Sequence, residues 1–355
     1  MKGLILAGGN GTRLRPLTHT GPKQLIPIAN KPNILYCLED LRDAGIVDIG
    51  IILGNNMPEK VRELLKDGSQ FGVSITYIEQ GEPKGIAHAV GCAEEFMAGE
   101  PFVVYLGDNI LNGGIRYMVD EFSRGGMEAL VALTPVDDPT KFGIAELDCE
   151  GNIIGLVEKP QQPKSDLAMI GIYFLRSSVF PIIHQLKPSW RNELEITDAI
   201  DTLRRTTGNV AARSVRGWWK DTGRPEDIIH ANRMVLSEMK GRIDGVVEEG
   251  ARVDGEVTVG EGTVIKAGSI VRGPVIIGRD CVIGPSARIG PYVAIGDRCS
   301  VSNGELEESI IMSGTTISCS KRIVDSLIGS GCVIESQHKK SGLRLVLGEN
   351  SQLRA

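Results

Sequence analysis

The sequence predicts an α/β domain built on a mixed, Rossmann-like sheet, followed by a parallel β-helix. Two observations carry this prediction. Residues 1–240 alternate short apolar runs with segments of helical spacing, which is typical of a sheet covered by helices on both faces. From Val247 onward an aliphatic residue returns at every sixth position, which is the hexapeptide repeat of a parallel β-helix. The predicted domains are residues 1–240 and 241–355.

The first domain is predicted from strands and helices that alternate along the chain. We expect strands at 4–7, 49–53, 74–78 and 102–106, and helices at 33–44, 58–66 and 87–97. Ligands in such sheets bind beyond the carboxyl ends of the strands. Gly8-Gly9 and Gly107-Asp108 follow two of these strands directly, so both are expected to border a ligand site.

The second domain is predicted from the phase of the repeat. Ten aliphatic residues are in phase, and a small or short residue stands four places after nearly every one; the ten are Val247, Val253, Val259, Ile265, Val271, Ile277, Ile283, Ile289, Ile295 and Val301. After Val301 the phase slips and resumes at Ile311, so we expect an inserted loop or bulged coil near residues 305–309. Cys281 and Cys299, three hexads apart, should stack on adjacent coils as small inward-facing side chains.

Composition and charge exclude several classes of protein. A formal net charge of -6 gives no basic footprint for nucleic acid. The seven cysteines contain no C-x-x-C pair, so neither a zinc site nor a disulfide framework is expected, and free thiols fit a reducing cytoplasm. No apolar run reaches the ~20 residues that a membrane span needs. We therefore expect a cytoplasmic protein without nucleic-acid or membrane partners.

A glycine-rich loop after the first strand is the first candidate for phosphate binding. It runs from Leu6 through Gly8, Gly9, Gly11 and Thr12 to Arg13, and glycines let backbone N–H groups approach phosphate oxygens. Leu14 stands where a Rossmann fingerprint requires glycine, and no lysine follows the glycines of the loop before Lys23, which excludes a Walker loop. Taken alone, the loop is equally consistent with an ordinary turn.

Six blocks in order resemble the signature of the sugar nucleotidyltransferases. They are Gly8 to Arg13, Pro22 to Pro32, Gly107 to Ile110, Glu158 to Pro160, Glu193 to Asp198 and Trp219 to Gly223. Within this family the chain is most similar to the glucose-1-phosphate thymidylyltransferases, in the long form that carries a left-handed hexapeptide β-helix. Phe142 departs from the short-form relatives, which carry tyrosine there, and the contact made by that hydroxyl is in doubt.

The resemblance implies Mg²⁺-dependent transfer of a nucleotidyl group from dTTP to glucose 1-phosphate, giving dTDP-glucose and pyrophosphate by in-line displacement. Arg13 and Lys23 would hold the triphosphate, and Lys159 would hold the sugar phosphate. Asp108 and Asp221 would share the Mg²⁺, which prefers one or two carboxylates together with phosphate oxygens and water. The reaction joins two polyanions, so positioning and electrostatic stabilisation are the main requirements.

The resemblance also assigns two binding regions. The nucleotide would contact Leu6, Gly8, Gly9, Gly11, Thr12, Gln24, Gln80, Pro83, Gly85 and Gly107. A glutamine amide such as that of Gln80 offers both a donor and an acceptor, which suits a pyrimidine edge. The sugar phosphate would contact Gly143, Glu158, Lys159, Ile170 and Arg191. His88, just after Gly85, is expected to pack or to face solvent rather than to bind the nucleotide.

Three alternatives stay open at this stage. Thymine and uracil differ by one methyl group, about 0.8 kcal/mol of burial, so UTP is an alternative to dTTP. A non-catalytic regulatory subunit would have lost a cation or metal ligand, and none is lost here. Acyl transfer by the β-helix would need a catalytic histidine, and His338 is the one histidine of that domain. The exposed faces and ends of a β-helix favour a homo-oligomer.

Overall fold

The computed structural model describes residues 1–336 and 345–354. By its contacts the chain forms two compact units, each made of two separate segments: residues 1–10 with 33–221, and residues 11–32 with 222–355. The segment that follows the first strand, together with the long helix after residue 222, thus groups with the β-helix. Whether residues 1–240 and 241–355 fold as independent domains stays a prediction. His338 lies outside the described residues.

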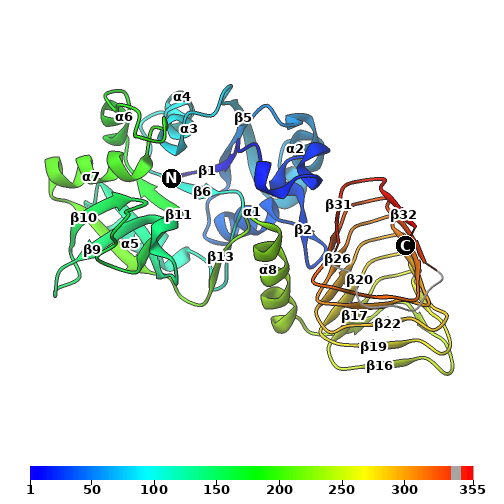
Figure 1. Ribbon diagram of the computed structural model, residues 1–355. Coiled ribbons are helices and arrows are strands. Elements are labelled where there is room, and N and C mark those ends of the chain that lie inside the picture. Colours follow the sequence, from blue (N-terminus) through cyan, green and yellow to red (C-terminus); the bar gives the residue numbers. More distant parts are fainter. Residues whose placement is uncertain (337–344, 355) are drawn as a thin grey trace. The chain divides into compact units, whose positions relative to one another are not determined.

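The first unit is built on a nine-stranded mixed sheet (Figure 1). Strands β6, β1, β4 and β5 are parallel neighbours, and β11 joins the sheet antiparallel to β6, β8 and β9. A separate antiparallel pair is formed by β7, which follows β6 in the chain, and β13. The strands are β1 (Lys2–Ala7), β4 (Asp48–Leu53), β5 (Ser74–Glu79), β6 (Phe102–Leu106), β7 (Asn109–Leu111), β8 (Ala129–Pro135), β9 (Gly143–Leu147), β10 (Ile153–Glu158), β11 (Leu167–Leu175), β12 (Val210–Ser214) and β13 (Trp219–Asp221).

Seven helices of this unit cover the sheet, and apolar side chains from both bury one another. They are α1 (Ile34–Asp43), α2 (Pro58–Leu65), α3 (Ile86–Gly91), α4 (Glu94–Met97), α5 (Arg116–Arg124), α6 (Val179–Ile183) and α7 (Ile196–Thr207). The predicted single helix over 87–97 is wrong in one respect: Ala93 leaves the helical conformation (φ -94°, ψ 2°), and the segment divides into α3 and α4. Among the described helices none is both long and apolar enough to cross a membrane.

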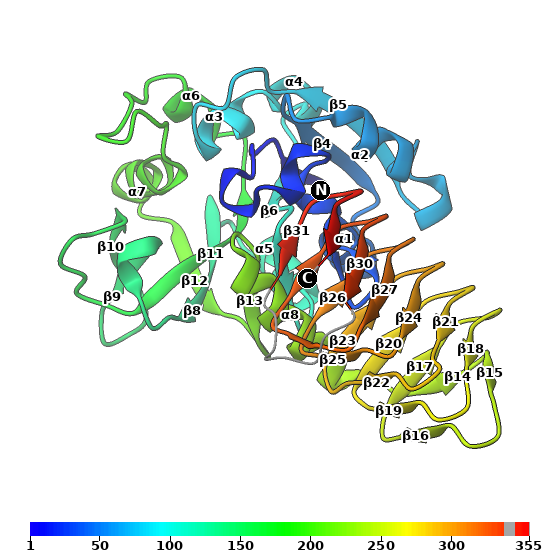
Figure 2. The same ribbon diagram turned by 45° about the vertical axis from the view of Figure 1, so that its right-hand side comes forward.

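The second unit contains three single-turn helices, a hairpin, a long helix and the β-helix. The single turns are Thr12–Leu14, Leu17–His19 and Lys23–Leu25, the hairpin pairs β2 (Pro27–Ile28) with β3 (Lys31–Pro32), and the helix is α8 (Pro225–Glu238). The β-helix stacks short parallel strands in three sheets, and its coils appear as successive rungs in Figure 2. The predicted Rossmann-like sheet and parallel β-helix are both confirmed, and the three-sheet stack is consistent with the left-handed form.

The strands of the β-helix follow the hexapeptide phase. One sheet contains β14 (Arg242–Ile243), β17 (Val257–Val259), β20 (Val275–Ile277), β23 (Val293–Ile295), β26 (Ile310–Ile311), β29 (Leu327–Ile328) and β31 (Val346–Leu347). The second contains β15 (Val246–Val247), β18 (Val264–Ile265), β21 (Val282–Ile283), β24 (Ser300–Ser302), β27 (Thr316–Cys319), β30 (Val333–Ser336) and β32 (Gln352–Arg354). The third contains β16 (Arg252–Asp254), β19 (Ile270–Arg272), β22 (Arg288–Ile289), β25 (Glu305–Glu307) and β28 (Arg322–Val324).

The predicted loop or bulge at residues 305–309 is wrong, because the phase slips through shorter coils. Ser300 pairs with Val282, 18 residues earlier, but with Thr316, only 16 residues later. Residues are therefore lost at the corners while the strands continue. Leu306, in β25, is fully buried and supplies the aliphatic residue that a strict period of six fails to find.

Cys281 and Cys299 stack on adjacent coils as predicted, and both are buried. They also take part in a ladder of polar contacts at one corner. The Cys281 N–H donates to Thr263 Oγ1 at 2.9 Å, and the Cys299 N–H donates to Cys281 Sγ at 3.4 Å. Thr263 Oγ1 in turn donates to the Gly278 carbonyl at 2.7 Å. Small inward side chains thus satisfy backbone groups that the corner would leave unpaired.

Candidate active site

The ends of β1 and β6 border the first part of the candidate site. The Gly107 N–H donates to the Leu6 carbonyl at 3.0 Å, which joins the two strand ends. Gly8 lies against Gln80, and a Cβ at residue 8 would overlap Gln80 Oε1. A larger residue at this position would displace the amide, so glycine lets the loop lie directly against it. Gly8 and Gly9 stand beyond the strand end, where the sequence predicts the ligand.

Strands β7 and β13 bring Asp108 and Asp221 to neighbouring positions. Asp221 is the cross-strand partner of Asn109, the residue directly after Asp108. Trp219 strengthens the pairing, because its indole N–H donates to Asn109 Oδ1 at 2.8 Å. Asp108 is buried, with 8% of its surface exposed. The structure thus places Asp221 on this two-stranded ribbon, opposite the residue that follows Asp108, although the two carboxylates are distant in sequence.

The donor chemistry of this ribbon fits Mg²⁺ better than a transition metal. Two carboxylates supply hard oxygen ligands, and Mg²⁺ is usually held by one or two carboxylates with substrate phosphates and water. The described residues contain no group of three or more His, Cys, Asp or Glu side chains suited to a metal. A metal at Asp108 and Asp221 would therefore need further oxygen ligands from a bound phosphate.

Phe142 packs against the ring of Trp219. The two rings meet edge to face with their centroids 5.7 Å apart. The Phe142 carbonyl also accepts the Lys159 N–H at 2.9 Å. Phe142 therefore has an apolar packing role, and it links the β7–β13 ribbon to the strand end that carries Lys159.

The predicted base-binding loop is held against the segment after α6. A Cβ on Gly85 would lie 2.7 Å from the Leu194 backbone nitrogen, and Gly85 has a φ of 106°. The Leu194 N–H donates to the Lys84 carbonyl at 2.7 Å, and the Ala87 N–H donates to the Leu194 carbonyl at 3.1 Å. Pro83 is exposed in the same loop. The structure thus brings the predicted base loop beside the predicted sugar-phosphate residues.

His88 contacts Gln80, which the sequence analysis did not anticipate. Gln80 Nε2 and His88 Nδ1 are 3.3 Å apart. Burial and the nearby Lys84 ammonium lower the pKa of His88, so the neutral ring is favoured near neutral pH. A neutral ring can accept from the Gln80 amide and fix its orientation. The spacing of eight residues across a turn gives no local signal for this pair.

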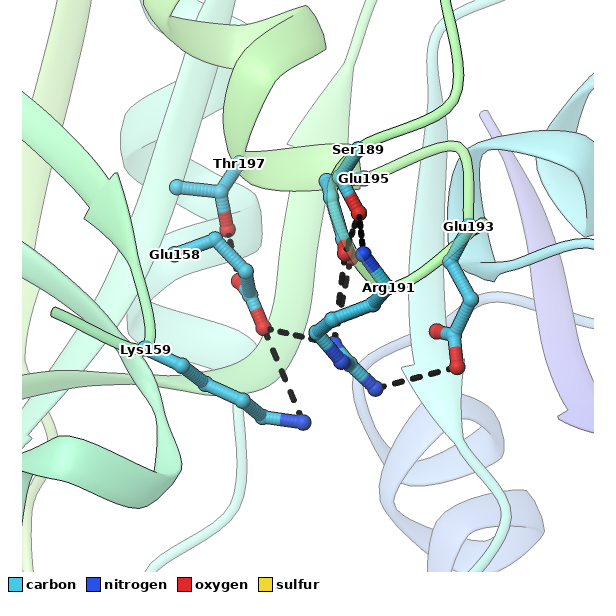
Figure 3. A network of polar contacts seen from close by, with 7 residues as sticks. All are labelled: Glu158, Lys159, Ser189, Arg191, Glu193, Glu195 and Thr197. Atoms are coloured by element: carbon cyan, nitrogen blue, oxygen red, sulfur yellow. Dashed lines mark hydrogen bonds and ion pairs between the residues drawn. The ribbon is translucent and has the colours of Figure 1, made fainter.

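A charged network lies at the predicted sugar-phosphate site (Figure 3). Arg191 is its centre: one guanidinium nitrogen lies 3.3 Å from both Glu158 Oε1 and Glu195 Oε1, and the other lies 3.0 Å from Glu193 Oε1. Lys159 Nζ lies 3.9 Å from Glu158 Oε1. Two cations thus stand beside three carboxylates, and an arriving phosphate could take the place of carboxylate oxygens around them.

Two hydroxyl groups orient the carboxylates of this network. Thr197 Oγ1 donates to Glu158 Oε2 at 2.6 Å, and Ser189 Oγ donates to Glu195 Oε1 at 2.7 Å. Glu195 is nearly buried, and this burial raises the pKa of its carboxyl group. The sequence analysis matched the block that contains Glu195 and Thr197 but gave neither residue a role. Glu195 directly precedes α7 and Thr197 lies in its first turn, and only the fold brings this helix end to the network.

Lys159 has a strained backbone and a shifted pKa. Its φ is 42°, which is uncommon for a residue with a side chain. Burial, followed by repulsion from Arg191, lowers the pKa of its ammonium group. Strained residues and perturbed cations are frequent at functional sites. Both features therefore agree with the role predicted for Lys159.

Gly143 and Ile170 complete the predicted sugar-phosphate residues. Gly143 pairs with Glu158 across β9 and β10, and a Cβ there would lie 2.6 Å from Thr197 Oγ1. Ile170 is buried in β11, between Met169 and Tyr173, where the register against β8 shifts. Such bulges often redirect side chains beside active sites. Both residues lie within the same unit as the charged network.

The remaining predicted residues belong to the second unit, in the segment 11–32. Thr12 and Arg13 form one single-turn helix, and Lys23 and Gln24 form another. Gly11, with φ 60°, joins them: a Cβ there would lie 2.8 Å from Thr18 Cγ2 and 3.3 Å from Lys23 Cβ. Gln24 is 1% exposed, and its Oε1 finds no hydrogen-bond donor among the described residues.

A separate hollow of about 490 Å³ contains none of the predicted site residues. It lies in the first unit, and its lining includes Asp40, Gly113, Arg116, Tyr117 and Arg216. The Arg216 guanidinium packs over the Tyr117 ring, 4.3 Å from its centroid. The candidate chemistry is therefore assigned from the strand ends and the charged network, where the polar groups converge, and not from the hollow.

Comparisons with known proteins agree with this assignment. The nucleotidyl transferase family matches residues 2–238, and the GMPPB C-terminal domain matches residues 271–355. The chain is 50% identical, over the full length of both proteins, to the low-salt glycan biosynthesis nucleotidyltransferase Agl11 of Haloferax volcanii. It is 45% identical to the glucose-1-phosphate thymidylyltransferase of Streptomyces antibioticus, with 99% of each chain covered.

A solved structure shows the same fold over about two thirds of the chain. A UDP-glucose pyrophosphorylase complexed with UDP-glucose matches with a TM-score of 0.60 and 30% identity, covering 67% of this chain and 99% of that chain. The match of the family over residues 2–238 and the two full-length relatives lead to the same assignment. The chain belongs to the nucleotidyl transferase family of enzymes.

Proposed function

We propose that this enzyme transfers a thymidylyl group from dTTP to glucose 1-phosphate in the presence of Mg²⁺. The observation that carries the proposal is the pairing of β7 with β13, which puts Asp221 opposite Asn109, the residue directly after Asp108. The charged network around Arg191 and Lys159 supplies cations for a sugar phosphate. The thymidylyltransferase relative, which aligns along the whole chain, supports the choice of substrates.

The reaction is a single displacement. An oxygen of the sugar phosphate forms a bond to the α-phosphorus of the triphosphate, the bond from that phosphorus to the bridging oxygen breaks, and the electron pair leaves with pyrophosphate. Lys159 and Arg191 orient the attacking phosphate, and Glu158 accepts hydrogen bonds from sugar hydroxyls. Arg13 and Lys23 bind the triphosphate and the departing pyrophosphate. Mg²⁺ held by Asp108 and Asp221 would neutralise phosphate charge.

Two polar groups support binding of the nucleotide itself. Gln80 presents an amide at the strand end beside Gly8, and the contact with His88 holds that amide in place. Gln24 Oε1 is a buried acceptor that lacks a donor among the described residues, and such groups usually have a partner. A hydroxyl or N–H group of the nucleotide would satisfy it. Each feature favours a polar ligand at a residue that the family resemblance assigns to the nucleotide.

UTP is the second candidate nucleotide. The specific observation in its favour is the likeness to a pyrophosphorylase complexed with UDP-glucose. One methyl group distinguishes the bases, so a pocket can separate them by about 10–200-fold at most. The proposal also includes a cytoplasmic location and a homo-oligomer.

The test is pyrophosphate release from glucose 1-phosphate with dTTP, UTP, ATP, GTP and CTP in parallel, with and without Mg²⁺. We expect the fastest release with dTTP, and none after chelation of the metal. Faster release with UTP would keep the mechanism and change the nucleotide. Absence of release with every triphosphate and with a panel of sugar 1-phosphates would contradict the proposed function.

A further inference from the structure

The turn that joins β2 to β3 is strained. Ala29 and Asn30 have φ values of 47° and 61°, so both central residues lie in the left-handed region. Two such residues form the turn that best fits a short hairpin. Asparagine tolerates this conformation, whereas alanine is disfavoured because its Cβ approaches a carbonyl oxygen. The turn needs support from its surroundings to keep this shape.

That support comes from α8 and from a coil of the β-helix, all within the second unit. The Ala29 N–H donates to Asn232 Oδ1 at 2.9 Å, and Asn30 Nδ2 donates to the Ile295 carbonyl of β23 at 2.6 Å. Asn232 is completely buried and donates through Nδ2 to the Tyr292 carbonyl at 3.2 Å. One amide thus connects the turn, the helix and the coil.

Further contacts fasten the same parts together. Arg233, next to Asn232 on α8, forms an ion pair with Glu308, and its guanidinium lies 5.1 Å from the centroid of the Tyr292 ring. Pro16 packs on the last described coil: a Cβ placed on Gly348 would lie 3.5 Å from Pro16 Cβ. The segment 11–32 therefore meets the β-helix at two separate coils.

The segment is also tightly packed within itself. Thr18 is buried, and its Oγ1 donates to the Gly11 carbonyl at 2.8 Å. Gly11 approaches both Thr18 and the Cβ of Lys23. A shift of the Ala29–Asn30 turn would therefore be transmitted to the single-turn helices that carry Arg13 and Lys23.

We propose that Asn232 is a positioning residue for nucleotidyl transfer, through which the β-helix holds the segment 11–32 in the conformation that binds triphosphate. This rests on the proposed function, because that function assigns Arg13 and Lys23 to the triphosphate. The β-helix thereby takes part in the reaction indirectly, because it positions the segment 11–32 and does not contribute side chains of its own.

The experiment compares the full-length variants Asn232→Ala and Thr263→Val. Thr263 is a buried β-helix residue whose hydroxyl bonds to the Gly278 carbonyl and the Cys281 N–H of the adjacent coil, so its loss destabilises that coil and leaves the contacts of the Ala29–Asn30 turn in place. For Asn232→Ala we expect the KM for the triphosphate to rise at least tenfold, with the KM for the sugar phosphate within twofold of wild type. Thr263→Val should lower the melting temperature and leave both constants unchanged.

A rescue variant separates positioning from general damage. Glycine adopts positive φ freely, so Ala29→Gly removes the backbone strain of the turn that Asn232 otherwise stabilises. In the Asn232→Ala background it should recover part of the lost triphosphate affinity. If Asn232→Ala fails to fold, Asn30→Ala replaces it and should shift the same constant in the same direction. Unchanged kinetics, or equal changes for both substrates, would overturn the proposal.

Failure of the proposed function would be distinguishable from failure of this inference. Binding of inorganic pyrophosphate by calorimetry reports on Arg13 and Lys23 without any turnover. Weaker binding in Asn232→Ala but not in Thr263→Val supports positioning, and equal binding in both variants and the wild type refutes it. Absence of turnover by the wild type with every sugar phosphate would refute only the proposed function.

Discussion

The charged network and the interior of the β-helix both bury polar side chains, but the groups to which those side chains bond are different. In the network, Arg191 is shared among three carboxylates, and each contact joins side chains. In the β-helix, Thr263 and Cys281 bond to backbone groups of the adjacent turn. Charged groups clustered in this way are expensive to desolvate, whereas neutral groups that complete the backbone are not.

The difference teaches which polar groups to assign to chemistry. The β-helix ladder satisfies groups that belong to the fold, and its contacts would be the same with or without a substrate. The network holds two cations beside three carboxylates, which is the arrangement that we propose for binding the sugar phosphate. Perturbed pKa values at Lys159 and Glu195 occur there. Five predictions test this division between polar groups that act in the reaction and polar groups that stabilise the fold.

The largest effect is expected from removing Asp108, the carboxylate directly before β7. Asp108→Asn should lower kcat by about 10²–10³-fold, the magnitude typical of losing one charge that stabilises the transition state. Because asparagine keeps the shape of the side chain, the melting temperature should stay close to that of wild type. Pyrophosphate release and circular dichroism measure the two quantities. The exposed Asp137→Asn is the control, and equal activity in both variants would refute the role of Asp108.

Breaking the centre of the network should affect binding and stability together. Arg191→Gln should raise the KM for the sugar phosphate about tenfold or more, and it should destabilise the fold by about 1–3 kcal/mol, because carboxylates lose their cation. The double variant with Glu195→Gln should recover part of the stability but not the KM. Denaturant unfolding with steady-state kinetics measures both. Recovery of the KM in the double variant would contradict a direct contact between Arg191 and the substrate.

The β-helix ladder should affect stability alone. Thr263→Val preserves shape but leaves the Cys281 N–H and the Gly278 carbonyl without their partner, for a loss of about 1–3 kcal/mol. Thr263→Ser keeps the hydroxyl and should lose less. Thermal unfolding of the two variants gives the comparison. A change in kcat at temperatures where both remain folded would show that the ladder, too, acts on the reaction.

The smallest effect is expected from pH. The pKa of Lys159 is lowered, chiefly by burial, and the charged form is the one that binds phosphate. The apparent affinity for the sugar phosphate should therefore fall as pH rises through this lowered pKa, below the ordinary value for lysine. Lys159→Arg should lose that alkaline limb, since arginine stays protonated. An unchanged alkaline limb in the variant would assign the titration to another group.

The lowered pKa of Lys159 also predicts the direction in which the free energy of unfolding changes with pH. Because the pKa of Lys159 is lower in the folded protein than in the unfolded chain, the unfolded chain binds more protons between the two values. The free energy of unfolding should therefore rise with pH across that interval. The Lys159→Met variant, which does not titrate, should show a smaller rise in urea unfolding experiments at alkaline pH.

Much of the candidate site could be predicted because its residues stand in short, recognisable blocks. Asp108 follows a buried strand, Lys159 follows another, and the glycine loop follows the first. The contacts made by Ser189, Thr197 and His88 could not be predicted, since each reaches a partner across a turn or from another element. Spacing in the sequence carries no information about such contacts.

The sequence by itself determined the two architectures and supplied the candidate site residues, because a period of six, an alternation of strands and helices, and a glycine after a strand are local patterns. Only the tertiary structure decided that Leu306 continues the shortened coils, that β13 pairs with β7, and that the segment 11–32 belongs with the β-helix. These depend on contacts between residues far apart in the chain, where burial and hydrogen bonding outweigh local preference.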